Sequence, residues 1–219
     1  MNVVLLGPQG AGKGTQAQAL KTRLGLVQVA SGDVLRAAIR EATDLGLQAK
    51  RYYDAGELVP DAITVGLLLE AIHAVPQEHD VLLDGFPRTV AQARALDEAL
   101  ADAGERIDLV LELRAPLEVV QERLLGRLIC RTCGTVYNVR SRPPKTPGIC
   151  DLDGGELYQR ADDYPEAIEK RLRIWEQENG QLVQYYDARG ILHPVDANRS
   201  PDAVTADLVA LVESAREAA

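Results

Sequence analysis

The sequence predicts an α/β protein in which a parallel five-stranded sheet is flanked by helices and carries a small β-rich insert. Short apolar runs alternate along the chain with segments of helical periodicity, as expected for a parallel sheet with crossover helices. The first apolar run ends in a glycine-rich turn that opens a helix. Periodicity is lost over residues 126–163, where all three cysteines lie.

Each element follows from its local pattern. The strand candidates are residues 2–6, 26–30, 81–84, 109–113 and 191–195. Helical patterning covers residues 15–24, 31–40, 45–55, 63–72, 91–102, 117–125, 164–186 and 201–217. Ser31 or Asp33 is the expected cap of the second helix, and Gly25 the expected end of the first.

Composition limits the function. Of the 219 residues, 46% are hydrophobic, which allows a substantial core. The net charge of −9 lacks the basic excess typical of nucleic-acid-binding proteins. The first residues contain no basic region followed by a long apolar run, and no stretch approaches the roughly 18 apolar residues of a membrane span. We therefore expect a soluble, cytoplasmic protein.

The turn after the first strand has the pattern of a phosphate-binding loop. It reads Gly7-Pro8-Gln9-Gly10-Ala11-Gly12-Lys13-Gly14-Thr15, a complete G-x-x-x-x-G-K between a strand and a helix. Its backbone N–H groups and the helix N-terminus favour an anion, and Lys13 can reach the outer phosphates. Gly14 stands where a hydroxyl usually ligates Mg²⁺, so we expect phosphates and water to hold most of that ion. The alternative is a glycine-rich turn with a chance lysine, which this context disfavours.

Three segments in order resemble the nucleoside monophosphate kinases, adenylate kinase above all. They are residues 7–16, residues 31–36 (SGDVLR), and residues 82–88 (LLDGFPR) with Gln92 beyond them. The resemblance spans nearly the whole chain and departs at Gln9, where the family usually has proline. It implies a core of the P-loop NTPase type formed by residues 1–29, 60–125 and 164–219. A mobile AMP-binding segment would be residues 30–59, and a lid residues 126–163.

The resemblance also implies residue roles. ATP would be bound by Gly10, Ala11, Gly12, Lys13, Gly14, Thr15, Arg123, Arg127 and Tyr137. AMP would be bound by Ser31, Arg36, Glu57, Leu58, Val59, Gly85, Phe86, Arg88, Gln92, Arg160 and Arg171, and Asp84 would order the waters of Mg²⁺. The catalytic cations would be Lys13, Arg88, Arg123, Arg160 and Arg171. Asp162 and Asp163 resemble an acidic pair that steers lid closure, and Leu128 replaces an arginine common in the family.

The chemistry of these side chains agrees with their implied roles. Two guanidinium groups, from Arg36 and Arg88, suit a phosphate dianion, and the Gln92 amide offers both a donor and an acceptor to adenine. Taken singly, each residue also has an ordinary interpretation. Arg36 could be a solvated charge, Asp84 could cap the following turn, and Arg123 with Arg127 could form a solvated helix face.

The cysteines predict a metal site in the insert. Cys130-x-x-Cys133 and Cys150-x-x-Asp153 form two half-sites with the spacing of a tetrahedral structural zinc site. Asp153 fits the two-residue gap better than Asp151. The family includes lids with such a Cys-Cys-Cys-Asp set. The alternatives are a redox pair at Cys130 and Cys133, which would normally open a helix, or no metal at all.

The predicted reaction is Mg·ATP + AMP ⇌ 2 ADP, serving adenine nucleotide homeostasis in a monomeric enzyme with no nucleic-acid or membrane partner. The AMP phosphate is already largely ionised at neutral pH, so no general base is required. One rival is a kinase for UMP, CMP or GMP. Another is a catalytically silent nucleotide-binding module whose zinc unit recognises a partner. A zinc-ribbon nucleic-acid binder is disfavoured by the acidic charge.

Overall fold

The computed structural model describes residues 1–55, 57, 59–160 and 163–218. Its centre is a parallel five-stranded sheet. In spatial order the strands are β2 (Val27–Ala30), β3 (Val81–Asp84), β1 (Asn2–Leu6), β4 (Ile107–Arg114) and β8 (Leu192–Asp196). The predicted fold class is confirmed.

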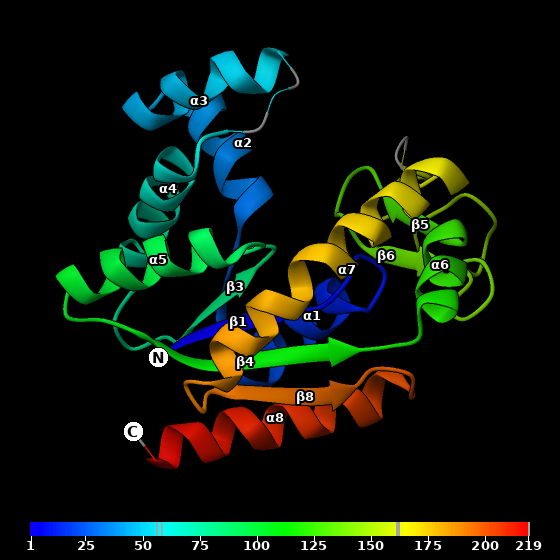
Figure 1. The fold of residues 1–219 in the computed structure, drawn as a ribbon. Helices are drawn as coiled ribbons and strands as arrows, with labels where there is room; N and C mark the ends of the chain where they lie inside the picture. The colour runs from blue at the N-terminus through cyan, green and yellow to red at the C-terminus, as the bar shows by residue number, and fades with distance from the viewer. Residues whose placement is uncertain (56, 58, 161–162, 219) are drawn as a thin grey trace.

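Helices cover both faces of this sheet (Figure 1). On one face lie α4 (Asp61–His73), α5 (Val90–Asp102) and α7 (Pro165–Asp187). On the other lie α1 (Lys13–Leu24) and α8 (Pro201–Ala218). The alternation of side chains along β1 explains the two layers, because Val4 and Leu6 pack toward the first group while Val3 and Leu5 pack toward the second.

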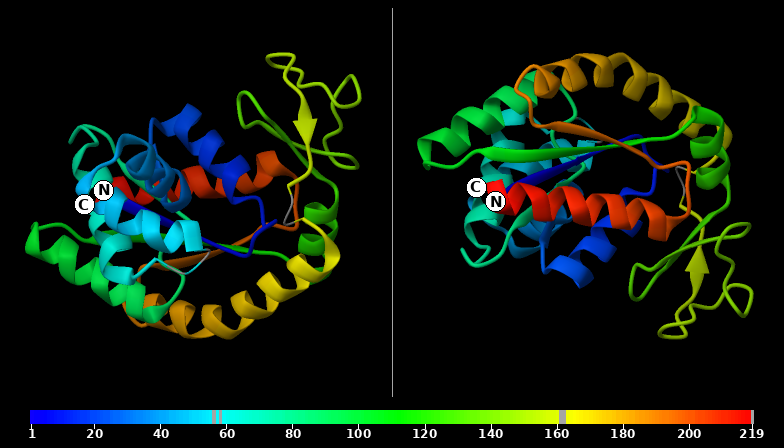
Figure 2. Two further views of the ribbon diagram at one scale, coloured as in Figure 1. Left: turned by 90° about the horizontal axis from the view of Figure 1, so that it is seen from above. Right: turned by 90° about the horizontal axis from the view of Figure 1, so that it is seen from below.

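Two smaller units are attached to the sheet. Helices α2 (Ser31–Glu41) and α3 (Asp44–Ala55) pack on each other and on α4, around Ala38, Ala49, Ile63 and Leu67. The second unit follows α6 (Leu117–Leu125) and is an antiparallel sheet in the order β6 (Val136–Asn138), β5 (Arg127–Cys130) and β7 (Leu157–Tyr158). Figure 2 shows this second unit projecting away from the main sheet.

The element boundaries lie close to the predicted ones, and α6 coincides with its prediction. One local prediction is wrong. Helix α2 has Ala30 at its N-cap with no side-chain capping bond, so neither Ser31 nor Asp33 caps it. The Ser31 hydroxyl instead donates a hydrogen bond to the Gly85 carbonyl, 54 positions away in the chain. Among the described residues, no helix is both long and apolar enough to pass through a bilayer.

Candidate active site

The phosphate loop begins where β1 ends, at the carboxyl edge of the sheet. Gly10 has φ +89°, and an added Cβ would lie 2.8 Å from Leu124 Cγ and 2.9 Å from the Val120 carbonyl oxygen. Gly12, the N-cap of α1, has φ +104°, which L side chains rarely adopt. Ala11 is buried, whereas Gly14 and Thr15 are exposed. The glycines thus let the backbone curve tightly and approach α6.

Lys13 is folded back over this loop. Its Nζ donates to the carbonyl oxygens of Gly7 at 2.6 Å and of Pro8 at 3.0 Å. The pKa of Lys13 is lowered from 10.5 to about 8, mainly by burial; Asp84 opposes this shift, and the nearby cations Arg88 and Arg127 add to it. An ammonium group held in these surroundings gains strongly from a bound anion.

The ends of β2 and β3 bring the next predicted residues to the same edge, since Ala30 and Asp84 are register partners. The carbonyl oxygen of Gly85 accepts from Ser31 Oγ at 3.1 Å and from Arg88 Nε at 2.8 Å. Asp84 accepts from Gln28 Nε2 at 3.0 Å, and burial raises its pKa despite the opposing charge of Lys13. The Asp84 carboxylate is therefore bonded to β2 and lies within electrostatic reach of Lys13.

Gln92 lies beside Arg88 at the start of α5. Its Oε1 accepts from the Arg88 backbone N–H at 2.8 Å, and its Nε2 donates to Asp61 Oδ1 at 2.8 Å. The backbone N–H of Gln92 is bonded to the Thr89 hydroxyl, which caps the helix. The sequence pattern predicted Gln92 as a base-binding residue but gave no reason to single out Asp61.

Other residues predicted for AMP lie on α2, on the connection to α4 and just after β3. Arg36 pairs with Asp33 on α2 and stays about half exposed. Glu57 is exposed, and Val59 packs against the apolar cluster that α2, α3 and α4 share. Leu58 lies outside the described residues. Phe86 is buried in the main core at 3% exposure, so its side chain supports the site from beneath.

The other arginines predicted to bind phosphates come from α6, the inserted unit and α7. Arg123, on α6, donates to the Ala197 carbonyl oxygen at 3.0 Å and thereby reaches the segment after β8. Arg127 forms a two-pronged ion pair with Asp163, at 2.8 Å and 2.7 Å, and Arg171 donates to the same carboxylate at 3.1 Å. Asp163 is buried and joins the start of β5 to α7. Arg160 is exposed, and Asp162 lies outside the described residues.

The four predicted metal ligands converge. One ligand atom each from Cys130, Cys133, Cys150 and Asp153 lies within 4.8 Å of the other three. Cys133 Sγ and Cys150 Sγ are 3.7 Å apart, and Cys130 Sγ is 3.3 Å from Asp153 Oδ1. A tetrahedron with Zn–S of about 2.3 Å and Zn–O of about 2.1 Å has edges of about 3.8 and 3.6 Å. The donor set and its spacing therefore fit a tetrahedral zinc ion.

The surroundings of this cluster do not fit a redox pair. All three cysteines are free, and Cys130 ends a strand and is followed by a turn, which does not fit a redox pair at a helix start. The Gly155 N–H donates to Asp153 Oδ1 at 2.9 Å and orients that carboxylate, while Asp151 accepts from the Lys145 N–H instead. Structural zinc sites have such supporting bonds.

Tyr137 and Leu128 also belong to this unit's interior. Tyr137 is 2% exposed, and its hydroxyl lies 3.5 Å from Cys150 Sγ and accepts from the Asp151 N–H at 2.8 Å. Its side chain is therefore directed at the metal cluster, and a contact with ATP would have to come from its backbone. Leu128 packs against the same cluster, which explains an apolar residue at this position.

Comparison with known proteins decides the family. Residues 5–191 match the sequence model described as ADK, adenylate kinase. The chain is 49% identical over 208 residues to the adenylate kinase of Bacillus subtilis, covering 95% of this chain and 96% of that protein. It is 46% identical over 212 residues to that of Methanosarcina acetivorans, covering 97% and 98%. The chain belongs to the adenylate kinase family. The predicted resemblance is confirmed.

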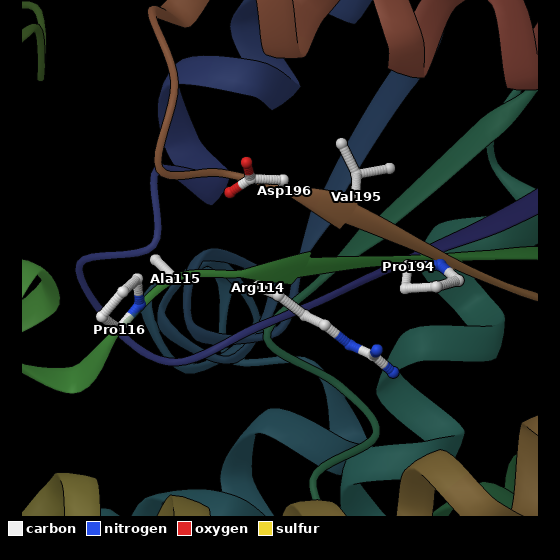
Figure 3. Close-up of a pocket in the computed structure, with 6 residues that line it drawn as sticks. All are labelled: Arg114, Ala115, Pro116, Pro194, Val195 and Asp196. Atoms are coloured by element: carbon white, nitrogen blue, oxygen red, sulfur yellow. The ribbon is translucent and has the colours of Figure 1, made fainter.

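A hollow of about 440 Å³ lies at the carboxyl ends of β4 and β8. Arg114, Ala115, Pro116, Pro194, Val195 and Asp196 line it (Figure 3). Arg114 extends away from Asp196 and pairs instead with the buried Glu112, at 2.7 Å. None of the described residues that the sequence analysis assigned to nucleotides lines this hollow, so it is distinct from the phosphate loop.

Proposed function

We propose that the chain transfers a phosphoryl group from Mg·ATP to AMP and so forms two molecules of ADP. Membership of the adenylate kinase family supports the reaction. The observation that carries the assignment of residues is the electrostatic coupling of Lys13 to Asp84, Arg88 and Arg127. These four residues come from the phosphate loop, β3, the turn after it and β5. Charged groups from separate segments therefore lie close enough to Lys13 to influence its pKa, which supports the assignment.

The proposed mechanism needs positioning more than proton transfer. An oxygen of the AMP phosphate attacks the terminal phosphorus of ATP, and that phosphate is largely ionised at neutral pH. Lys13, Arg88, Arg123, Arg160 and Arg171 would neutralise charge on the transferring group. The Mg²⁺ that accompanies ATP would offset part of the negative charge of the phosphates. Asp84 would hold waters near that ion.

The two nucleotides would occupy neighbouring sites. ATP would lie on residues 10–15, with Arg123, Arg127 and the backbone of Tyr137 above it. AMP would bind between Ser31, Arg36, Gly85, Arg88 and Gln92, with residues 57–59 near its base. Arg160 and Arg171 would reach the phosphates of both. The carbonyl of Gly85 already joins Ser31 to Arg88, which supports a shared AMP site.

The unit of residues 126–163 would act as a lid. Water competes with AMP for the phosphoryl group, and an enclosed site excludes it. Asp163 binds Arg127 and Arg171 where this unit joins α7, so it is placed to hold both cations until phosphates attract them. Zn²⁺ on Cys130, Cys133, Cys150 and Asp153 would be structural, because four protein ligands leave no open position. We further propose a cytoplasmic, monomeric enzyme.

A direct assay tests this function. The protein with Mg·ATP and AMP should form ADP, and Arg88→Ala should lower the turnover number at least about 100-fold, because a charge-stabilising donor is lost. The matched control is Arg173→Ala, an exposed arginine of α7 paired with Glu169, which should keep turnover within about twofold. Full activity in Arg88→Ala would refute the assignment. A clear preference for GMP, CMP or UMP over AMP would refute the proposed substrate.

A further inference from the structure

The side-chain amide of Gln92 is bonded on both sides. Its Oε1 accepts from the backbone N–H of Arg88, and its Nε2 donates to Asp61 Oδ1, each at 2.8 Å. Asp61 is the first residue of α4, whereas Gln92 is in the first turn of α5. Both side chains are partly buried. Two helices therefore contribute to holding one amide.

The polarity of the two partners fixes which way the amide points. A backbone N–H can only donate, and an ionised carboxylate can only accept. Asp61 lies in the first turn of α4, so its carboxylate is near the positive end of the helix dipole. In the reverse orientation, the Gln92 NH₂ group would face the Arg88 N–H, and its carbonyl oxygen would face a carboxylate. Both contacts would be repulsive, so one orientation is strongly preferred.

The capping of α5 explains only half of this arrangement. Thr89 and Gln92 are three residues apart and resemble a capping box, in which the glutamine side chain turns back to a backbone N–H before the helix. That motif is local and requires only the contact with Arg88. The contact with Asp61 joins residues 31 positions apart and has no part in capping. It needs a separate explanation.

The amide keeps one lone pair on Oε1 and one N–H on Nε2 for a ligand. Adenine presents an amino group at C6 and an unprotonated N1, which are a donor and an acceptor side by side. A 6-oxopurine such as hypoxanthine or guanine presents the reverse pair, an oxygen at C6 and a proton on N1. The two orientations of a glutamine amide therefore match the two classes of purine, one each.

From this we propose that Asp61 is a positioning residue for base selectivity: it holds the Gln92 amide in the orientation that binds adenine and opposes 6-oxopurines. The inference rests on the proposed function, in which Gln92 contacts the base of the acceptor nucleotide. Selectivity arises as much from penalising the wrong base as from binding the right one. A freely turning amide would serve both purine classes and discriminate poorly.

The test compares AMP with inosine monophosphate, which differs from it only by the oxygen at C6 and the hydrogen on N1. In Asp61→Ala and Asp61→Asn, the ratio of kcat/KM for AMP to that for inosine monophosphate should fall about tenfold, equivalent to about 1.4 kcal/mol. The change should lie in KM, with kcat for AMP kept within about twofold. The asparagine variant is isosteric and can donate or accept, so it removes the polarity of the contact without removing its shape.

Controls separate this role from a structural one. Asp202→Ala removes an exposed first-turn acid from α8 and should leave the ratio unchanged. Gln92→Ala should abolish most of the selectivity. If Gln92→Ala leaves the ratio at its original value, the proposed contact with the base is wrong. If Gln92→Ala abolishes the selectivity but Asp61→Asn keeps it, only the role of Asp61 is overturned. Should Asp61→Ala fail to fold, the Asp61→Asn result decides.

Discussion

The main sheet and the unit of residues 126–163 differ in what holds each together. The sheet has two apolar layers, in which side chains such as Leu5, Leu96 and Leu111 are at most 1% exposed. Among its described residues, the smaller unit has a buried cluster of Cys130, Tyr137, Cys150 and Leu157, and two of these four are candidate metal ligands. Leu152, by contrast, is 72% exposed.

This difference follows from size. A unit of a few tens of residues encloses too little apolar surface to offset the conformational entropy of ordering its chain. Four ligands that converge on one ion can supply the missing free energy, because an ion binds the folded arrangement and not the unfolded chain. The core should therefore respond to loss of packing, and the lid to loss of metal. Experiments on either region can test whether the two regions are stabilised in these different ways.

The largest effect is expected from removing a metal ligand. The unsubstituted chain should bind one zinc ion and Asp153→Ala nearly none, with loss of a local stabilisation on the order of 10 kcal/mol. Limited proteolysis should then cut within residues 126–163, while the circular dichroism of the core helices persists. The matched control is Asp151→Ala, whose carboxylate accepts from the Lys145 N–H, and which should retain the ion. Equal destabilisation of the core and the lid would contradict the distinction.

A smaller effect is expected from core packing. Leu111, on β4, is 0% exposed, and Leu111→Ala should lower the global free energy of unfolding by about 2–5 kcal/mol through lost transfer energy and a cavity. The equivalent change in the lid, Leu157→Ala, should alter global unfolding by less than about 1 kcal/mol while the metal is bound. Denaturant unfolding measures both. A chelator should affect the stability of the lid variant more than that of Leu111→Ala.

Asp163 tests the junction between the two regions. Asp163→Asn keeps the shape of the side chain but leaves Arg127 and Arg171 without their shared countercharge. The arginine side chains are 17% and 19% exposed and keep some contact with water. We therefore expect a loss of about 1–3 kcal/mol, below the roughly 3–5 kcal/mol for breaking a fully buried pair. The control is Glu166→Gln in the first turn of α7, and thermal unfolding is the measurement. Equal melting temperatures would show that the junction is held by other contacts.

Features set by neighbouring residues could be predicted from the sequence. The strands, the helices and the phosphate loop each follow from a short pattern. The metal site needed only two half-sites whose spacing brings them together in a small unit. The bounds of α6, Leu117–Leu125, agree with the predicted range because they follow from local helical periodicity. The predicted convergence of Cys130, Cys133, Cys150 and Asp153 is also confirmed.

Features that depend on how elements pack could not be predicted. The hydroxyl of Ser31 leaves its own helix because β2 and β3 bring the Gly85 carbonyl within reach. Asp61 meets Gln92 only because α4 and α5 lie side by side on one face. The family resemblance implied that Tyr137 contacts ATP, yet its side chain is buried beside Cys150. A local pattern states which groups are present, and tertiary packing decides which partner each one finds.

The pKa of Lys13 tests whether the electrostatics of the phosphate loop depend on the core alone or also on the unit of residues 126–163. The main cause of its pKa of about 8 is burial in the loop, and Arg127 of the smaller unit has a weaker effect than Asp84 or Arg88. In the unfolded chain the pKa is 10.5. Between these two values the unfolded state binds more protons, so this group makes stability increase as pH rises from 8 to 10.5.

Nucleotide binding should reverse the shift, because bound phosphates favour the charged ammonium. At pH 8.5 the free protein should have Lys13 mostly neutral, and ATP binding should take up about 0.7 proton; near pH 6.5 the uptake by this group should be close to zero. Calorimetry in buffers of different ionisation enthalpy measures it, with Lys13→Met as the control that removes it. In Arg127→Ala most of the uptake should remain, because burial in the loop is its main cause. If the uptake disappears in that variant, the lid controls the electrostatics of the phosphate loop, and the two regions are less separate than their packing indicates.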